Sequence, residues 1–344
     1  MVKKFVYGTP FETEAVVKEI PSSEGNPDYG TFSTENGFSF TTKLADDDMV
    51  FGLGEANRGI NKRGFLYISD CADDPNHVES KTSLYAAHNF IIISGKTHVG
   101  FFFDYPGTLR FDIGYTTSDT MTVSCENADL YVYMITGDSD LDIVKQFRGI
   151  IGRSYIAPKF AFGYGQSRWG YKTEDDFRTV VKKYRENHVP LDMVYMDIDY
   201  MQDYKDFTVN EERFPDFEGF VQDMKKEKIH LVPIIDAGVK VEEGYDIYEE
   251  GCEKGYFCRR EDGSYFEATV WPGWTHFPDV LNADARKCFG DKYDVLVSKG
   301  IDAFWNDMNE PSIFYSQEGL ADFKETAKKY AEGDPEVPHY MVCL

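Results

Sequence analysis

The sequence predicts an α/β protein in which an N-terminal antiparallel β-sandwich is followed by the first half of a (β/α)8 TIM barrel. Up to about residue 135, short apolar runs recur between turn signals with no helical pattern between them, which is typical of a sandwich. From Lys159 onwards, strand and helix patterns alternate, as they do in a barrel. The most informative stretch is GIDAFWNDMNEPS, from Gly300 to Ser312. In it an apolar strand ends in a polar cluster, and Pro311 then prevents further strand pairing.

The composition fits a folded protein with a large core and disfavours some partners. With 42% hydrophobic and 16% aromatic residues, the 344-residue chain can bury a sizeable core. The formal charge of −24 argues against nucleic acid and anionic membranes as partners, because both need basic surfaces. An acidic, aromatic-rich chain suits a neutral polar ligand such as a carbohydrate. Surface carboxylates that only keep a protein soluble explain the charge equally well.

The sequence also predicts a cellular compartment. The opening MVKKFVYGTPFETEAV has no apolar signal core, and no window approaches the length of a transmembrane helix. The six cysteines are scattered without a CxxC pair, so we interpret them as free thiols of a reducing compartment. These features predict a cytoplasmic protein.

Residues 1–137 are predicted to form the sandwich domain. Its strands share a short apolar or alternating pattern between turn residues: Phe38–Thr42, Asn89–Ile93, Val99–Asp104, Leu109–Ile113, Met121–Cys125 and Leu130–Ile135. The segment FGLGEANRG, Phe51–Gly59, is similar to a dinucleotide-binding loop. We reject that interpretation because Asn57 stands where the third glycine should be and no βαβ unit surrounds it. The run Asp70–Asn76 is predicted to be a loop.

A linker helix is predicted over residues 138–157. Asp138 or Ser139 can cap it, and Phe147 and Ile151 repeat at helical spacing. Pro158 follows, so we place the domain junction near residue 155.

Residues 158–344 are predicted to form the first part of the barrel, with four strands each followed by a helix or a long connection. Besides the strand in the opening stretch, the predicted strands are Phe160–Gly165, Met193–Ile198 and Ile229–Ile235. One predicted helix begins after Thr173, which has Asp176 three positions on. Two further predicted helices cover Phe217–Met224 and Cys288–Val297. Ala237–Ala283 is predicted to be a long aromatic loop.

The strand ends carry the acidic residues. Right-handed crossovers bring Asp197, Asp236 and Asp307 to one rim of the barrel. A doubly wound open sheet is the competing architecture. It usually has a glycine-rich phosphate loop after its first strand, and residues 166–169, QSRW, are unlike one.

Carboxylates gathered on one rim can bind a metal, act as an acid/base or nucleophile pair, or accept hydrogen bonds from sugar hydroxyls. We expect only one of Asp197 and Asp199 to face the site easily, and no HExxH motif is present. We therefore expect no metal and no cofactor. Sugar binding gains support from the four tryptophans, which lie at strand ends or in the aromatic loop and can stack on sugar rings: Trp169, Trp271, Trp274 and Trp305.

These residues are similar to those of a known family. Phe304–Pro311, reading FWNDMNEP, resembles the nucleophile signature of glycoside hydrolase family 31, the α-glucosidase and α-xylosidase family. Further motifs follow the family's order: Gly52–Glu55 (GLGE), Asp197–Met201 (DIDYM), Phe214–Asp216 (FPD), Pro233–Asp236 (PIID) and Val270–Gly273 (VWPG). The resemblance covers essentially the whole chain. It implies a retaining, exo-acting α-glycosidase with an N-terminal β-sandwich before a (β/α)8 barrel.

The resemblance also implies roles for individual residues. Asp307 would be the nucleophile, and Asp197 would accept hydrogen bonds from the hydroxyls farthest from the bond being cut. Trp169 would lie at the leaving-group subsite. One sandwich loop would reach the pocket, with Asp73 as the candidate and Asp70 or Asp74 as substitutes. The remaining residues would shape the pocket of the terminal sugar: Ile198, Ile234, Asp236, Trp271, Trp305 and Met308.

The chain departs from the family pattern in one respect. The family's acid/base aspartate follows the nucleophile on a later strand, whereas Gln317–Leu344 is charged and has no strand-end Asp. We therefore expect this sequence to be the N-terminal part of a longer enzyme or half of a split one, with the rest of the barrel as its partner. Alone it should not turn over substrate, because leaving-group protonation contributes roughly 10²–10⁴-fold.

The leading hypothesis is a retaining α-glucosidase acting on short α-linked oligosaccharides. The same nucleophile would serve an α-xylosidase, a sulfoquinovosidase or a transglycosylase with different pocket walls. A catalytically silent sugar-binding protein is the alternative from another class, because half of the catalytic pair is not visible.

Overall fold

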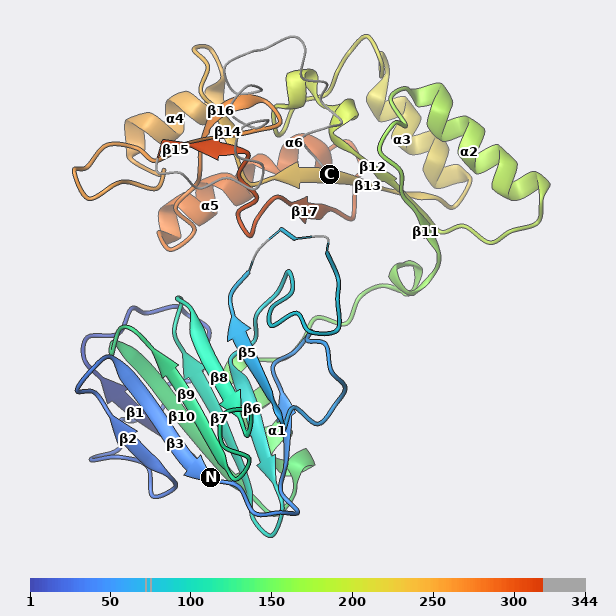
Figure 1. The fold of residues 1–344 in the computed structure, drawn as a ribbon. Helices are drawn as coiled ribbons and strands as arrows, with labels where there is room; N and C mark the ends of the chain where they lie inside the picture. Colours follow the sequence, from blue (N-terminus) through green and yellow to red (C-terminus); the bar gives the residue numbers. More distant parts are fainter. Residues whose placement is uncertain (72, 75, 318–344) are drawn as a thin grey trace. The chain divides into compact units, whose positions relative to one another are not determined.

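The computed structural model describes residues 1–71, 73–74 and 76–317. Contacts divide the chain into two compact units, the first from Met1 to Tyr155 and the second from Ile156 onwards. Figure 1 shows that the first unit consists of strands and one helix, whereas the second unit combines several helices with strands. The sequence predicts no strand-end Asp in Gln317–Leu344. Residues 318–344 of this segment lie outside the described part of the chain.

The first unit is a sandwich of two five-stranded antiparallel sheets, as predicted. One sheet has the order β1 (Val2–Tyr7), β10 (Leu130–Gly137), β7 (His98–Asp104), β6 (Phe90–Ser94) and β4 (Met49–Gly52). The other has the order β2 (Thr31–Ser33), β3 (Phe38–Lys43), β9 (Thr120–Cys125), β8 (Leu109–Ile113) and β5 (Phe65–Ser69).

All six predicted strands are present, and the four that the sequence did not predict are β1, β2, β4 and β5. These four are the edges of the two sheets. An edge strand is short or partly exposed and pairs on one side only, so its residues need not follow a strong apolar pattern. Three-residue β2, for example, has no buried side chain.

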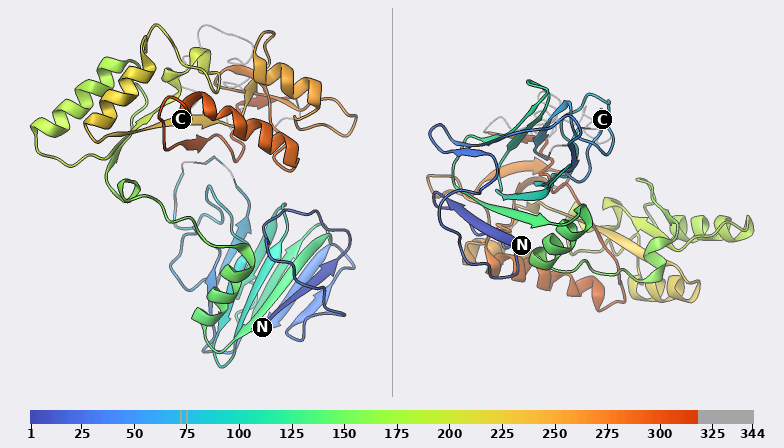
Figure 2. Two further views of the ribbon diagram at one scale, coloured as in Figure 1. Left: turned by 180° about the vertical axis from the view of Figure 1, so that it is seen from behind. Right: turned by 90° about the horizontal axis from the view of Figure 1, so that it is seen from below.

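Aromatic rings fill the space between the sheets. Phe40 of β3 and Phe101 of β7 are both fully buried, and their ring centroids are 4.7 Å apart. The outer face of the β10–β7–β6 layer is covered by helix α1 (Asp140–Ile151). Phe147 of α1 stacks on Phe90 at 3.9 Å between centroids. Because β10 is covered on both faces, its first six residues are all buried, which explains its continuous apolar sequence (Figure 2).

The capping residue of α1 is Ser139, whose side chain accepts a hydrogen bond from the backbone N–H of Asp142. Of the two predicted capping residues, the structure therefore uses the serine. By its packing on β10 and β7, α1 belongs to the first unit.

The rejected dinucleotide loop is a tight turn at the end of β4. Gly52 has φ +125°, and a Cβ atom there would lie 2.2 Å from the carbonyl oxygen of Phe90. That oxygen already accepts a hydrogen bond from the backbone N–H of Leu53 at 2.9 Å, so it is held in place. The glycine is required by the close approach of two backbone segments, and phosphate binding plays no part in that requirement.

We expect Gly52→Ala to lower the free energy of unfolding of the first unit by about 3 kcal/mol, from backbone strain and steric overlap together. Gly64→Ala is the matched control, because Gly64 has φ +89° but nothing within 4 Å of an added Cβ, so only strain of about 1 kcal/mol applies. Urea unfolding followed by far-UV circular dichroism measures both. Equal losses in the two variants would contradict the steric argument.

The second unit contains the predicted parallel sheet, with the order β11 (Gly165–Gln166), β12 (Met193–Met196), β13 (His230–Asp236) and β17 (Trp305–Asp307). All three pairings are parallel. Helices α2 (Glu174–Glu186) and α3 (Phe217–Lys226) bury Phe177 and Phe220 in the core that this sheet shares. Thr173 and Asp176 form the predicted capping box of α2.

The first barrel strand was predicted too long. Lys159–Phe162 forms a 3-10 turn, and only Gly165 and Gln166 pair in the sheet. The ring of Phe160 stacks at 3.5 Å between centroids on His230, the first residue of β13, so this apolar residue packs on the sheet without pairing in it.

The prediction of a long loop over Ala237–Ala283 is wrong in part. The segment contains β14 (Val239–Lys240), α4 (Asp246–Lys254), β15 (Glu267–Val270) and β16 (Gly273–His276). With β18 (Tyr315–Ser316) the strands form a second sheet, antiparallel, in the order β14-β16-β15-β18. Its buried positions include Thr269 and Thr275, so the strands lack an apolar pattern. Instead, the Thr275 hydroxyl donates to the carbonyl of Ala268 at 2.9 Å.

Two helices lead into the last parallel strand. They are α5 (Ala283–Lys292) and α6 (Asp294–Val297), which correspond to the single helix predicted around Cys288–Val297. Gly300 follows with φ +103° and ends the helical segment. β17 then delivers Asp307 to the end of the sheet.

Candidate active site

The register of β13 and β17 places two predicted site residues beside each other. In this parallel pair, Ile234 is opposite Trp305 and Asp236 is opposite Asp307. Side chains two positions apart on a strand share a face, so these four residues lie on one side of the sheet. The two carboxylates are at the carboxyl ends of their strands, where barrel enzymes place their catalytic groups.

Asp197 follows β12 and caps the short 3-10 turn Ile198–Tyr200. Its carboxylate accepts a hydrogen bond from the backbone N–H of Ile198 at 2.8 Å. Burial is the main cause that raises the pKa of Asp197, and the negative charges of Asp307 and Asp199 raise it further. The parallel pairings of β12 with β13 and of β13 with β17 place the end of β12 on the same rim as the end of β17.

Asp199 makes different contacts from Asp197. Its side chain is 1% exposed and forms an ion pair with Arg213, with 3.1 Å between Oδ1 and Nη1. Arg213 also donates to the backbone carbonyl of Asp199 at 2.8 Å. The two aspartates of the DID motif therefore have different structural roles. Asp199 anchors the turn through Arg213, whereas Asp197 caps the 3-10 turn at the end of β12.

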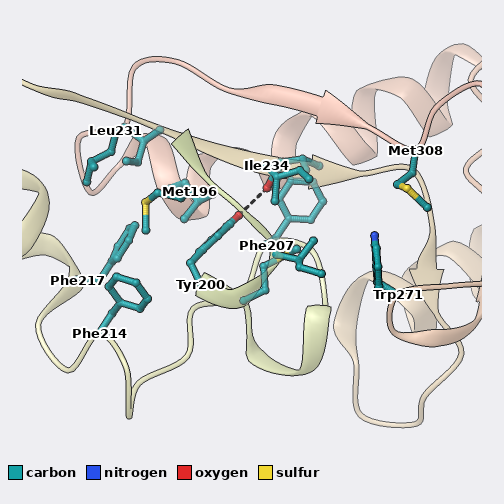
Figure 3. Packing of buried hydrophobic residues seen from close by; sticks show 14 of the residues in the cluster. Met196, Tyr200, Phe207, Phe214, Phe217, Leu231, Ile234, Trp271 and Met308 are labelled. Carbon is teal, nitrogen blue, oxygen red and sulfur yellow. Dashed lines mark hydrogen bonds between the residues drawn. The ribbon is translucent and has the colours of Figure 1, made fainter. Parts of the chain in front are cut away.

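Four of the predicted pocket residues are buried apolar side chains. Ile198 and Ile234 are each 1% exposed, and Trp271 and Met308 are each 7% exposed. Figure 3 shows the side chains of Trp271 and Met308 pointing toward one another. Met308 has φ +60°, which ends the strand immediately after Asp307.

Trp305 and Trp169, the other two tryptophans predicted to line the site, are held by defined contacts. The indole N–H of Trp305 donates to the backbone carbonyl of Met196 at 3.2 Å, which ties β17 to the end of β12. Trp169 is 37% exposed, and its ring centroid lies 5.7 Å from that of Trp271. Trp169 is therefore an accessible aromatic surface next to a buried one.

Asp73 lies in the first unit, in the loop between β5 and β6, and is half-buried. Its contribution to the pocket stays a prediction. The other nine predicted site residues all lie in the second unit.

Sequence reasoning missed two residues at the site. The ring of Phe314 packs edge-on against Trp271 at 5.1 Å between centroids, although it follows Pro311 in a segment with no strand pattern. Asp206 is 1% exposed, and its Oδ1 accepts the backbone N–H of Asp236 at 2.9 Å. An aspartate between Lys205 and Phe207 in a turn-rich segment has the sequence pattern of a solvated residue, so no local signal identifies it.

The site contains two strongly perturbed carboxyl groups. Burial raises the pKa of Asp206 well above its usual range. Burial also raises the pKa of Asp236, and the neighbouring carboxylates of Asp206, Asp307 and Asp197 add to this effect. Asp236 is 2% exposed.

A cavity of about 570 Å³ adjoins Asp236 and Asp307. Its walls are mostly aromatic and aliphatic: Phe266, Phe277, Val280, Phe289, Pro311 and Ile313. Carboxylates at one end of an apolar pocket can orient a polar ligand while the walls exclude water. A carboxylate so placed can also act as a nucleophile.

The described residues show neither a metal centre nor a membrane-spanning helix. Within residues 1–71, 73–74 and 76–317, no group of three or more His, Cys, Asp or Glu side chains is arranged to hold a metal ion. Within the same residues no helix is both long and apolar enough to cross a bilayer.

Two protein-family models match the chain, one in each of its two units. Residues 154–342 match the glycosyl hydrolases family 31 TIM-barrel domain. Residues 11–112 match the glycosyl hydrolase 31 N-terminal galactose mutarotase-like domain.

Curated relatives are longer than this chain. Alpha-glucosidase 2 of Bacillus thermoamyloliquefaciens is 37% identical over 277 residues, which are 79% of this chain and 35% of the relative. Alpha-glucosidase of Saccharolobus solfataricus is 28% identical over 318 residues, which are 91% of this chain and 46% of the relative. The chain thus spans between about a third and a half of the length of these two relatives.

Solved structures confirm the predicted fold. A family 31 alpha-glucosidase from Bacteroides thetaiotaomicron has a TM-score of 0.73 at 23% identity, over 87% of this chain and 52% of that one. A mutant GH31 dextranase from Flavobacterium johnsoniae, complexed with isomaltotriose, has a TM-score of 0.74 at 23% identity, over 83% and 35%. At these identities the likeness shows the fold alone.

Proposed function

Because the chain belongs to glycoside hydrolase family 31, we propose that the protein is an exo-acting retaining α-glucosidase that releases terminal α-linked glucose from short oligosaccharides. The observation that supports this most is the pairing of Asp236 with Asp307 at the carboxyl end of the sheet, with Asp197 on the same rim. Three acids that are far apart in the sequence therefore lie on one rim of the sheet.

Asp307 is the proposed nucleophile. Its carboxylate attacks the anomeric carbon, the bond to the leaving oxygen breaks, and a covalent glycosyl-aspartate forms. A retaining enzyme needs a second carboxyl at about 5–5.5 Å, which first protonates the leaving oxygen and then deprotonates water. We assign that role to neither of the other two strand-end acids, Asp236 and Asp197. Asp236 is 2% exposed, and Asp197 is committed as an acceptor to the N–H of Ile198.

Asp197 is the proposed acceptor for the hydroxyls at the far end of the sugar. An ionised carboxylate accepts two hydrogen bonds from adjacent hydroxyls, and burial strengthens such bonds. Ile198, Ile234, Trp271 and Met308 would then pack against the faces of the ring. Trp169, being accessible, would contact the sugar that leaves.

The rest of the barrel is the proposed partner of this chain. β17 is the last strand of the parallel sheet formed by the described residues, and its outer edge has no strand beside it there. A further strand pairing with β17 would continue the barrel. A cytoplasmic location is also a proposal, supported by the five described cysteines, all of which are free thiols.

The covalent intermediate can be tested by trapping. In the protein at its natural length, an activated fluorinated α-glucoside should add one fluoroglucosyl group, and peptide mass mapping should place it on Asp307. Asp307→Asn should not be labelled, whereas Asp262→Asn, an exposed turn residue, should be labelled normally. Label on a different residue would refute the assignment. Faster labelling by a fluorinated xyloside would indicate an α-xylosidase.

A further inference from the structure

Asp206 is a second buried acid next to Asp236, outside the residues that the proposed reaction uses. It lies in the irregular segment between β12 and α3 and is 1% exposed. Its Oδ1 accepts the backbone N–H of Asp236 at 2.9 Å. The hydroxyl of Tyr245 donates to the backbone carbonyl of Asp206 at 2.8 Å, so the segment is fixed on both sides.

The two buried carboxyl groups are not neutralised by the described residues. Asp206 Oδ2 and both carboxylate oxygens of Asp236 have no hydrogen-bond partner there, and no ion pair reaches either group. The nearest lysine in the sequence, Lys205, directs its ammonium to Glu242 at 2.6 Å.

The other titratable groups around the pair are acids. Phenols face it from three elements: Tyr200 of the turn after β12, Tyr245 before α4, and Tyr293 between α5 and α6. The carboxylates of Asp197 and Asp307 act on Asp236 from the neighbouring strand ends. None of these groups supplies a positive charge.

Two adjacent carboxylates in an apolar interior cannot both stay ionised without a cation, because burial and mutual repulsion both favour the neutral form. Such a pair titrates as a unit and keeps a proton at a pH where separate carboxyls have lost theirs. A protonated carboxyl can donate to the ionised one, which would satisfy an oxygen that otherwise lacks a partner.

We propose that Asp206 and Asp236 form a carboxylic acid–carboxylate pair that holds one proton at neutral pH, with Asp206 as the positioning residue for Asp236. The pair then adds one negative charge, not two, next to Asp307. If the proposed function holds, this limits the repulsion that opposes ionisation of the nucleophile. The proton itself does not depend on that function.

Infrared spectroscopy tests the proton directly. At pH 7 the protein should show the carbonyl stretch of a buried protonated carboxylic acid. Asp206→Asn should lose this band, because the amide can donate to Asp236 and leave it an ordinary carboxylate. Asp203→Asn, an exposed residue of the same segment, should keep the band. A wild-type protein without the band, or a band that survives in Asp206→Asn, would overturn the proposal.

Unfolding gives a second readout that needs no activity. A carboxyl that holds its proton more tightly in the folded state than in the unfolded chain makes stability fall as pH rises. The wild type should therefore lose more stability between pH 5 and pH 8 than Asp206→Asn. Equal pH dependence of the two would count against the pair. Urea unfolding followed by tryptophan fluorescence is suitable, because all four tryptophans lie in the second unit.

Measurements of kcat/KM then distinguish the positioning role of Asp206 from its effect on charge. The net charge of the pair is the same in the wild type and in Asp206→Asn, so the acidic limb of kcat/KM should shift by less than about half a pH unit. Asp206→Ala, which loses both the acceptor and the donor, should lower kcat/KM by about tenfold or more. An acidic limb shifted down by about one unit in Asp206→Asn would mean that Asp206 is ionised. If no variant hydrolyses a glucoside, the proposed function fails while the infrared result still decides the pair.

Discussion

Asp307→Asn is expected to lower kcat for hydrolysis of an α-linked glucose disaccharide by about 10⁴-fold or more, in the protein at its natural length. The amide keeps the size and hydrogen-bonding geometry of the side chain but cannot donate an electron pair to the anomeric carbon. Its partner in the register, Asp236, and Trp305 on the same face of β17 keep their places, so binding should change far less than kcat. Initial rates over a range of substrate concentrations measure both quantities.

The matched control is Asp302→Asn. Asp302 lies just before the same strand, and its carboxylate pairs with His230 at 3.0 Å on the exposed side. This variant should retain kcat within about twofold, as expected of a surface substitution. Near-normal kcat in Asp307→Asn would mean that the nucleophile is a different residue.

Tyr200→Ala is expected to lower the free energy of unfolding of the second unit by about 4 kcal/mol. Tyr200 is fully buried, and its ring occupies the core between the turn after β12 and strand β13. Its hydroxyl donates to the backbone carbonyl of Ile234 at 2.8 Å, as Figure 3 shows. Removing the side chain leaves a cavity and also removes this buried hydrogen bond.

Tyr200→Phe separates the two contributions. It keeps the ring and removes only the hydrogen bond, so the expected loss is about 1–2 kcal/mol. Urea unfolding followed by tryptophan fluorescence reports on the second unit alone, because the first unit has no tryptophan. Unchanged midpoints in Tyr200→Ala would show that Tyr200 does not hold the two acid-bearing strand ends together.

Much of the fold could be predicted from the sequence. Central strands such as β7 and β10 are covered on both faces and therefore consist of nearly continuous apolar residues. Helix α2 could be located from its capping residues because Thr173 and Asp176 bond to each other's backbone N–H groups locally. The edge strands and the antiparallel sheet around Trp271 were not predicted, because their residues depend on partners elsewhere in the chain.

The candidate site could be predicted only in part, because sequence motifs give residue types and strand ends but not side-chain contacts. Alternation along a strand places residues two positions apart on one face, so it does not distinguish Asp197 from Asp199. The structure does distinguish them, because the chain turns at Asp197 into a 3-10 turn and Asp199 forms an ion pair with Arg213. Arg213 is fourteen positions away, at no fixed spacing from the motif.

The sequence by itself determined the order of the elements and the acids at the strand ends, since both follow from local apolar patterns and turn residues. Only the tertiary structure decided which acids meet. The register of β13 and β17 sets Asp236 beside Asp307, and the packing of a separate segment buries Asp206 against them. A pKa depends on burial and on charges across space, and neither is a property of neighbouring residues in the chain.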